Sequence, residues 1–522
     1  MNMRNNIKTI LFFITASLFV ACDDAIDITQ PSELPPDRVY ESVNDMQLGL
    51  NGIYASIPGE NHIYFTSLFT DEVAIGRANG GQGTDGQLAF LLNANSGDAA
   101  GIWGSNYTLI NRTNWLINGV ENVVIQPDDE ATEEDEDETE WYNHILAQAR
   151  ALRALGHFQL MTYFAEDMKN DASLGVIVMD FAPDGDDIYL ELPRNTTGEV
   201  FSFIDADLQF AEANLAATNP VPGLERGEPF VNPNFYVSKG FILAFKARMA
   251  AYRGQYAAAN GFVDQLSYTL TNKTNYPRIW TDELTGGATD EVIFKVNRSN
   301  PGGNTTGNFA QFWSSVNSSV TGSPFFEVNR ALFNLVNINN TNIDVRKFVI
   351  VDPSALISPN YQSLNDYDYA QQDVLPVGKY SRTEGLNLLA DIKVFRYSEM
   401  VLIKAEYFAS IGDVPSAIAQ VNRIRLARIN AANQIQNPSS YTVQQAWAFI
   451  LRERRIELAF EGHRYVDLRR LGPLAGQAVD RDPRDCAWNT FCTLDPTDYR
   501  FVMPIPRLET AANSNLQQNP GY

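Results

Sequence analysis

The sequence predicts a mostly α-helical fold in which tetratricopeptide-like helix pairs form a scaffold for long ligand-binding loops. Apolar residues recur three and four positions apart over several long segments, and two of these segments repeat each other. Stretches rich in Asn, Gly, Ser and Thr separate the helical parts. Hydrophobic residues make up 44% of the 522 positions, which is enough to build a sizeable core.

The first residues have the pattern of a secretory signal peptide. A start that carries Arg4 and Lys8 leads into the short apolar run ILFFITASLFVA, and Cys22 follows. The cysteine after Ala21 resembles a bacterial lipobox, in which the thiol is diacylated; a plain cleavage site with an incidental cysteine is the alternative. We expect a signal peptide over 1–21 and a lipid anchor on Cys22.

The segment 22–39 is polar, acidic and rich in proline, so we expect a flexible tether. Acids directly after the cysteine resemble the surface-export signal of Bacteroidetes lipoproteins. This resemblance implies that the rest of the chain, 40–522, lies outside the cell.

Helical periodicity dominates the chain from there on. In Trp141–Ala165 the apolar residues fall three or four apart, as on one face of a helix. The segments 199–215, 238–255 and 405–429 have the same pattern.

Two segments align without a gap and predict helix pairs of tetratricopeptide type. KARMAAYRGQYAAANGFVDQL and KAEYFASIGDVPSAIAQVNRI share small residues where two helices approach and a glycine at the turn between them. A chance helical hairpin is the alternative. The matched positions are Ala247 with Ala405, Gly254 with Gly412, and Ala259 with Ala417.

A loop-rich insertion is expected at about 290–393. It opens with EVIFKV, a predicted strand, and continues into an Asn/Gly/Ser/Thr-rich stretch with embedded aromatic residues, where binding groups tend to lie. NGGQGTDGQLAFLLNANSGDAAGIW has the same character nearer the N-terminus. The acidic run Asp128–Glu140 predicts a solvated loop; a loose cation site, calcium included, is an alternative, although the run lacks EF-hand spacing.

Charge and cysteine content exclude several classes of protein. With 63 acidic against 39 basic residues and a net charge of −24, the chain lacks the clustered positive charge that nucleic acids require. Cys486 and Cys492 form a disulfide or stay free; their spacing does not match a zinc site, and we expect no metal and no cofactor.

The segment Arg452–Gly472, RERRIELAFEGHRYVDLRRLG, is dense in arginines and acids. Glu453, Glu457 and Glu461 lie four apart on a helical face, with Arg454 and Arg455 between them. A catalytic carboxylate pair is the rival interpretation, but adjacent arginines lower carboxylate pKa values and leave no general acid. We interpret the segment as a buried, paired framework.

Several motifs together resemble the SusD/RagB family of Bacteroidetes outer-membrane lipoproteins. They are ARALRALGHFQLMTYFAED, LPRNTTGEVFSFIDADLQFAEANL, RYSEMVLIKAEYFASIGDVPSAIAQVNRIRLAR, ILRERRIELAFEGHRYVDLRRLG and the ending MPIPRLETAANSNLQQNPGY. The resemblance spans nearly the whole chain.

This resemblance implies a single mostly α domain that binds oligosaccharide or polysaccharide at the cell surface. It also implies delivery of the ligand to a SusC-like TonB-dependent transporter, without catalysis. No GxSxG, Walker or HExxH motif is present in the sequence. The same architecture binding peptides or another nutrient is the alternative, and a surface glycosidase or an adhesin is a minor one.

Sugar binding needs aromatic faces and planar hydrogen-bonding groups. By region, the resemblance places ligand contacts at Trp313 with Phe309 and Phe312 in the large insertion, at Trp103 with Asn106, and at Arg77. Packing is the alternative for each, evenly balanced for Trp103, and we expect Trp280 to be a packing residue.

Overall fold

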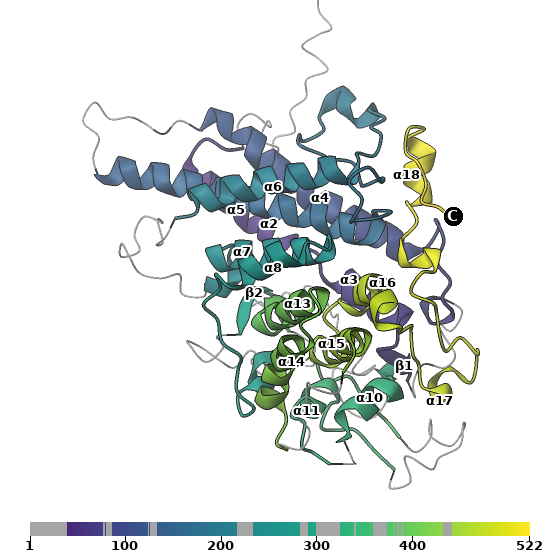
Figure 1. Ribbon diagram of the computed structural model, residues 1–522. Helices are drawn as coiled ribbons and strands as arrows, with labels where there is room; N and C mark the ends of the chain where they lie inside the picture. The colour runs from purple at the N-terminus through teal and green to yellow at the C-terminus, as the bar shows by residue number, and fades with distance from the viewer. Residues whose placement is uncertain are drawn as a thin grey trace, which may run out of the picture.

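The structure is a computed structural model of the chain, and its main body is a stack of helix pairs (Figure 1). It describes residues 39–76, 79, 86–123, 125, 133–216, 233–281, 291–298, 324–338, 341–358, 373–380, 382–383, 386–387, 390–431 and 441–522. The expected signal peptide, Cys22 and nearly all of the tether lie outside these residues. In the described part, no helix combines the length and the apolar character needed to cross a membrane.

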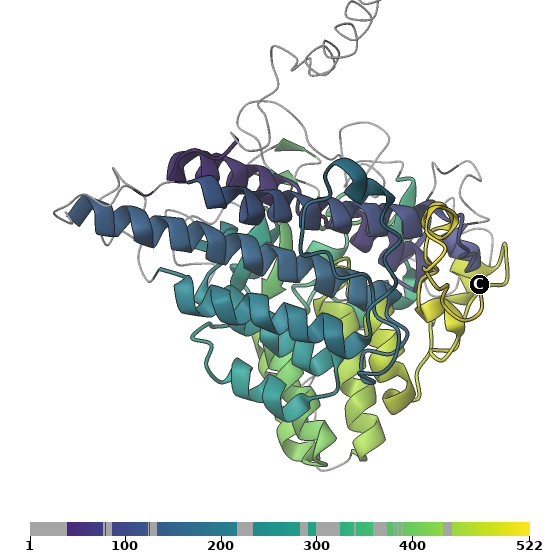
Figure 2. The same ribbon diagram turned by 90° about the horizontal axis from the view of Figure 1, so that it is seen from above.

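Four long helices form the N-terminal layer: α2 (Val43–Ala55), α4 (Gly97–Gly119), α5 (Glu133–Phe164) and α6 (Thr197–Asn214). They run roughly parallel to one another when viewed from above (Figure 2). Side-chain caps begin two of them: Ser42 accepts from the Asp45 N–H, and Thr196 accepts from the Glu199 N–H. In both helices the acid at the third position also bonds back to the cap, so two free amides are satisfied at each start.

The periodic segment Trp141–Ala165 forms most of α5, as predicted. The helix also extends back to Glu133, so the second half of the acidic run is helical and the predicted loop is wrong there. Glutamate is a good helix former, and negative charge in the first turns is favoured by the helix dipole. These two preferences outweigh the repulsion among the acids.

The two repeated segments form matching helix pairs, as predicted. They are α7 (Lys239–Tyr252) with α8 (Tyr256–Val263), and α13 (Tyr397–Ser410) with α14 (Val414–Arg428). At the two turns Gly254 and Gly412 adopt φ of 73° and 78°, a left-handed conformation that residues with a Cβ rarely adopt. The matched alanines are all fully buried where the helices meet: Ala247, Ala259, Ala405 and Ala417.

A third pair, α15 (Val443–Glu457) with α16 (Arg464–Ala475), continues the stack. Helix α7 lies against α6, α13 against α8, and α15 against both α13 and α14. Figure 1 shows this order from the N-terminal layer downward, with α10 (Arg330–Val336) and α11 (Lys347–Ile350) beyond it.

The strands in the described residues are short and pair in twos. β2 (Val292–Val296), the predicted strand EVIFKV, pairs antiparallel with β6 (Ile392–Arg396). The chain therefore returns at about residue 393 to the place from which it left at about residue 290, which are the bounds expected for the insertion. The other pairs are β1 (Val73–Ile75) with β3 (Phe326–Val328) and β4 (Arg382–Thr383) with β5 (Leu386–Asn387).

The remaining short elements connect these layers. They are α3 (Glu60–Phe69), α17 (Pro483–Cys486), α18 (Arg507–Ala512) and the 3-10 helices η2 (Gln87–Ala89), η3 (Val120–Asn122), η4 (Gly185–Tyr189), η5 (Pro233–Phe235), η6 (Tyr276–Trp280) and η10 (Tyr499–Phe501). The C-terminal segment returns to the N-terminal layer (Figure 1), where Asn519 donates to the Phe164 and Met503 carbonyls at 2.9 and 2.6 Å.

Candidate functional site

The strands β1 and β3 hold together the start of one predicted ligand loop and the end of the other. Their register pairs Val73 with Val328 and Ile75 with Phe326. One residue further along, the Gly76 N–H donates to the Phe325 carbonyl at 2.9 Å. A Cβ at Gly76 would lie 2.2 Å from the Pro324 carbonyl oxygen, so this close approach requires glycine.

In the sequence, the predicted ligand residues follow β1 or precede β3. Arg77 directly follows Gly76, while Phe309, Phe312 and Trp313 belong to the segment that ends at Pro324. All four lie outside the described residues, so their role stays a prediction. The structure nevertheless places the end of one loop beside the start of the other, although 248 positions separate Gly76 from Pro324 in the numbering.

Buried charges fix the base of β1. Both oxygens of the Asp71 carboxylate accept from Arg464 at 2.8 Å, and the Asp480 N–H donates to it at 2.9 Å. Burial alone would raise the pKa of Asp71, but Arg455 and Arg464 outweigh it and lower the pKa to about 2. The strand is therefore bound to α15, α16 and the C-terminal region by a permanent negative charge.

The neighbouring Glu72 is a buried carboxyl of the opposite kind. Ser67 Oγ and the Phe460 N–H donate to it at 2.7 and 3.0 Å, but arginine side chains form no bond with it. Burial dominates and raises the pKa of Glu72 to about 7. Among the described residues of this region, Glu72 is a carboxyl group that titrates near neutral pH.

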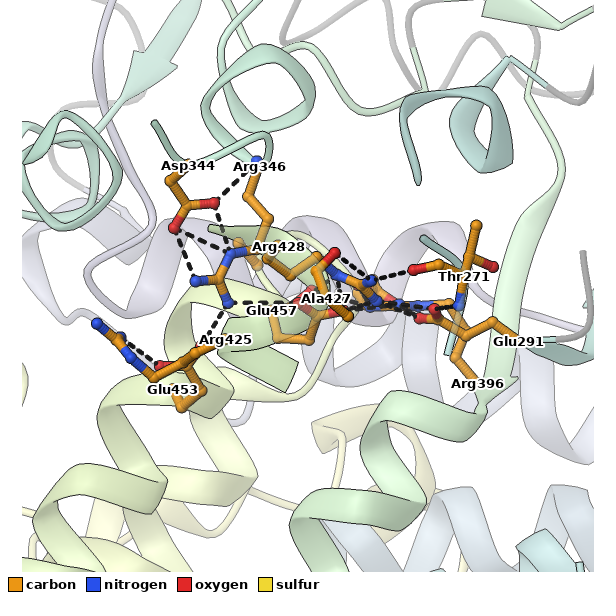
Figure 3. A network of polar contacts seen from close by, with 12 residues as sticks. Thr271, Glu291, Asp344, Arg346, Arg396, Arg425, Ala427, Arg428, Glu453 and Glu457 are labelled. Atoms are coloured by element: carbon orange, nitrogen blue, oxygen red, sulfur yellow. Dashed lines mark hydrogen bonds and ion pairs between the residues drawn. The ribbon is translucent and has the colours of Figure 1, made fainter. Parts of the chain in front are cut away.

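The dense Arg/Glu segment is a buried framework, as predicted (Figure 3). Glu457 accepts from Arg428 at 2.9 Å, from Arg396 at 3.1 Å and from Arg346 at 3.3 Å. Glu453 accepts from Arg346 at 2.6 Å and Arg425 at 3.0 Å. All of these side chains are buried, as is Glu291, which binds Arg396 and Arg428.

The partners within this framework differ from the expected ones. Arg454 and Arg455 do not pair with the glutamates of their own helix; Arg454 donates to Asp467 at 2.7 Å, and Arg455 lies 3.4 Å from Asp71. Helix α15 also ends at Glu457, so Glu461 lies beyond it and binds Arg396. Arginines from distant segments converge on these acids because only multiple partners offset the cost of burying each charge.

Two acids of this framework, Glu457 and Glu461, are poorly suited to act as a general acid. Burial would raise the pKa of Glu457, but Arg428, Arg396 and Arg346 together hold it far below the usual range of a glutamate. The pKa of Glu461 is likewise lowered, against its burial, by Arg396 and Lys379.

Trp103 and Asn106 are buried within α4. The Trp103 ring is 3% exposed and lies 5.0 Å from the Phe164 ring and 4.9 Å from the Tyr107 ring, centroid to centroid. Asn106 Nδ2 donates to the Ile102 carbonyl at 2.8 Å and lies 3.1 Å from His62 Nε2. This environment favours packing, and a ligand contact at either residue stays a prediction.

Trp280 is 4% exposed, in agreement with the packing role expected for it. Its ring lies against Tyr380, and Lys379 Nζ is 4.1 Å from the ring centroid. The Lys379 ammonium group therefore covers one face of the Trp280 ring, so Trp280 packs against residues of the insertion.

A small pocket of about 80 Å³ lies where α3, α5, α7 and β6 meet. His62 and His463 line it, and burial lowers the pKa of His62 to about 4 and that of His463 well below its usual value. The volume suits a few water molecules and is too small for a sugar ring. In the part of the chain that the structure describes, no three His, Cys, Asp or Glu side chains are grouped as metal ligands.

Cys486 and Cys492 are joined by a disulfide with a Cα–Cα distance of 5.3 Å, which resolves the alternative left open by their spacing. The loop that it closes carries Trp488 and Phe491, which are 41% and 45% exposed. Sequence reasoning gave neither aromatic residue a role. The available signal was two large aromatic residues inside a short cysteine loop, CAWNTFC.

Comparisons with known proteins agree with this architecture. Residues 376–522 match a family model described as "SusD family", and residues 23–221 match one described as "Starch-binding associating with outer membrane". The chain belongs to the SusD/RagB family. The first of these matches contains both α13–α14 and the α15–α16 framework, and the second contains most of the N-terminal layer and β1.

Individual SusD/RagB relatives match along almost their full length. "SusD-like protein P2" of Formosa agariphila is 25% identical, over 98% of this chain and 99% of the relative. A SusD superfamily protein of Bacteroides thetaiotaomicron superimposes with a TM-score of 0.71 at 23% identity, over 92% of this chain and 100% of its own. A "Laminarin binding SusD-like protein" superimposes with a TM-score of 0.61 at 20% identity, over 92% of this chain and 100% of its own. These structural likenesses show that the chain has the mostly helical SusD fold.

Proposed function

We propose that this SusD/RagB protein binds oligosaccharide or polysaccharide at the cell surface and delivers it to a SusC-like TonB-dependent transporter. The observation that carries the proposal is the β1–β3 pair, which joins the start of one loop to the end of the other, and the composition of both loops suits a sugar. Asn79 reinforces this junction: it is fully buried and donates to the Phe325 carbonyl at 3.3 Å. Loops rooted on a rigid base can present binding groups with little loss of conformational entropy.

The comparisons support a carbohydrate as the ligand class. One matching family model carries a starch-binding description, and a fold neighbour is described as binding laminarin. The role that we assign is binding without catalysis. For the framework acids it is supported by the lowered pKa values of Glu457 and Glu461, because the general acid of a glycosidase must hold a proton that it can give up.

We further propose that the protein is held on the outer membrane by lipid on Cys22, after removal of 1–21. The tether 22–39 would then present 40–522 to the exterior as a single domain. A Cys22→Ala variant tests the anchor: we expect it to leave the membrane fraction, whereas the unaltered protein stays there and is removed by protease added to intact cells. Retention of the variant in the membrane, or protection of the unaltered protein from protease, would contradict this arrangement.

Ligand binding is tested with soluble protein that starts at Asp23. Native gels cast with single polysaccharides, followed by calorimetric titration, should show retardation by one polysaccharide. We expect Trp313→Ala to lose this retardation and Tyr189→Ala, a control at a 77% exposed aromatic residue, to keep it. Binding of peptide digests with no polysaccharide bound would refute the glycan proposal in favour of peptide uptake, and release of reducing sugar would identify a glycosidase.

The transporter partnership has its own readout. Full-length lipidated protein is solubilised from outer membranes and captured, and we expect a TonB-dependent transporter to co-purify with it. Capture of the protein alone, under conditions that keep glycan binding intact, would favour an adhesin.

A further inference from the structure

The disulfide loop Cys486–Cys492 holds two exposed aromatic rings in a fixed position. Trp488 is the most exposed tryptophan of the described residues, at 41%, while Trp103, Trp141, Trp280 and Trp447 are all below 9%. Phe491, three residues further on, is 45% exposed. Two exposed aromatic rings within one short loop offer a large apolar area that a ligand can cover.

Several bonds remove the freedom that a surface loop normally has. Besides the disulfide, Trp488 Nε1 donates to the Asp485 carbonyl at 3.0 Å, which fixes the orientation of the indole. Asn489 Nδ2 donates to the Leu88 carbonyl at 3.2 Å, and the Phe491 ring lies 6.3 Å from the Phe90 ring in an edge-on arrangement. The loop is therefore organised before any ligand arrives, which lowers the entropy cost of binding.

The same loop is bound to the roots of the two predicted ligand loops. Asp485 forms a fully buried ion pair with Arg330 at 2.6 Å, and it also accepts from the Arg330 N–H at 2.6 Å. Arg330 opens α10 two residues after β3 ends, and α17 lies against β1. Leu88 and Phe90, which contact the loop, belong to the stretch that follows β1 in the chain. Figure 1 shows α17, β1 and α10 together at one corner of the molecule.

We propose that Trp488 and Phe491 form an additional sugar-contacting surface, on which the apolar faces of pyranose rings of a neutral glycan lie. This inference rests on the proposed function and extends it: the disulfide loop would contact parts of a long chain beyond the β1–β3 loops. The exposed residues Thr490 and Thr493 are close to the rings in the sequence, as suits a ligand with apolar ring faces and hydroxyl edges.

Charge argues against a lipid surface as the occupant. Binding at a lipid surface is strengthened by lysines and arginines beside the aromatic residues. Here the exposed charges around the loop are acidic, with Asp480 78% exposed and Asp495 exposed, in a chain of net charge −24. The area of two aromatic rings is also far smaller than the contact area that a stable complex with a protein partner requires.

The test compares Trp488→Ala and Phe491→Leu with the unaltered protein. Each is titrated with the polysaccharide that retards the unaltered protein and with fragments of increasing length. We expect affinity for the longest chains to fall about tenfold in each variant, since one aromatic contact is worth roughly that factor, while the shortest bound fragment is unaffected. Trp488→Phe should restore most of the affinity because it restores a flat face.

Three controls separate the possible outcomes. Tyr189→Ala, in η4, removes an aromatic residue that is 77% exposed and should change no affinity. A thermal melt checks that Trp488→Ala remains folded. Oxidation by N-bromosuccinimide followed by peptide mapping should show that the bound polysaccharide protects Trp488.

The result that overturns this inference is unchanged affinity at every chain length in both variants, or unprotected Trp488, while Trp313→Ala still loses binding. If the unaltered protein binds no polysaccharide, the proposed function itself fails. The two failures are therefore distinct.

Discussion

Replacing Glu457 by Gln should destabilise the fold strongly while it leaves the ligand site untouched. The carboxylate accepts hydrogen bonds from Arg346, Arg396 and Arg428, and all four side chains are fully buried. Glutamine has nearly the same volume but no charge, so it creates no cavity. It removes one of the negative charges that balance three buried guanidinium groups.

The size of the effect follows from the cost of a buried charge without compensation. Removing one partner of a buried ion pair typically costs about 3–5 kcal/mol. Glu291 and Glu453 remain and keep part of the balance, so we expect a value near the lower end of this range. With an unfolding entropy of about 2.1 cal/mol/K per residue, a chain of this size has about 1 kcal/mol/K in total, so the melting temperature should fall by about 3 °C.

The assay is a thermal melt followed by circular dichroism at pH 7, beside a binding titration. Asp264→Asn is the matched control, since it removes one charge from a partly exposed pair with Lys404 and should shift the melt by less than 1 °C, as surface pairs contribute about 1 kcal/mol or less. Equal shifts in the two variants would refute the framework assignment. So would weaker glycan binding by folded Glu457→Gln protein.

Three further predictions concern backbone strain and pH. Gly412→Ala should destabilise the fold by about 1 kcal/mol because the backbone φ at this position is 78°. Gly52→Ala should stabilise the fold by up to about 1 kcal/mol, because Gly52 lies in α2 and no atom is within 4 Å of the added Cβ. Urea titrations of both variants measure this contrast. Glu72→Gln should flatten one part of the pH profile. Between pH 4.5 and 7 the native carboxyl keeps a proton that the unfolded chain releases, so the stability of the unaltered protein falls as pH rises. Melts at pH 5 and 8 should show the variant gaining more at pH 8 than at pH 5. In the Glu72→Gln variant, the four histidines should make stability fall as pH drops from 6.5 toward 4. Burial lowers their pKa values in the native state, so over this range the unfolded chain binds protons that the native histidines do not bind. A constant melting temperature over this range would contradict the argument.

The helical scaffold could be predicted because its signals are local. The alignment of the two repeats placed Ala247 on Ala405 and Gly254 on Gly412, and each pair has the same environment in the structure. Helix spacing, small residues at close approaches and glycine at left-handed turns act over a few residues, so one sequence suffices to detect them.

The partners of the buried charges could not be predicted in this way. Composition indicated that Glu457 would be paired, yet its arginines come from positions 346, 396 and 428, and nothing local to any of them specifies the others. The nearest arginines in the sequence, Arg454 and Arg455, point to different acids.

The candidate site was predicted in its composition but not in its geometry. Loop texture indicated the segments of Arg77 and Trp313, but β1 and β3 have three residues each, too few for a periodic signal, so their pairing was not foreseen. Trp103 was predicted to contact a ligand by position along the chain, and position alone cannot distinguish an exposed ring from a buried one.

The bond between Asp71 and Arg464 has a consequence for how the chain reaches its final form. Synthesis produces Asp71 first, and its partner follows 393 residues later. Until Arg455 and Arg464 exist, a hydrated carboxylate is far more stable than a buried one, so the segment around β1 cannot close over the wrong neighbours. The acids that hold the finished core together thus keep the early chain hydrated, and the segment around β1 can be completed only after Arg464 has been made.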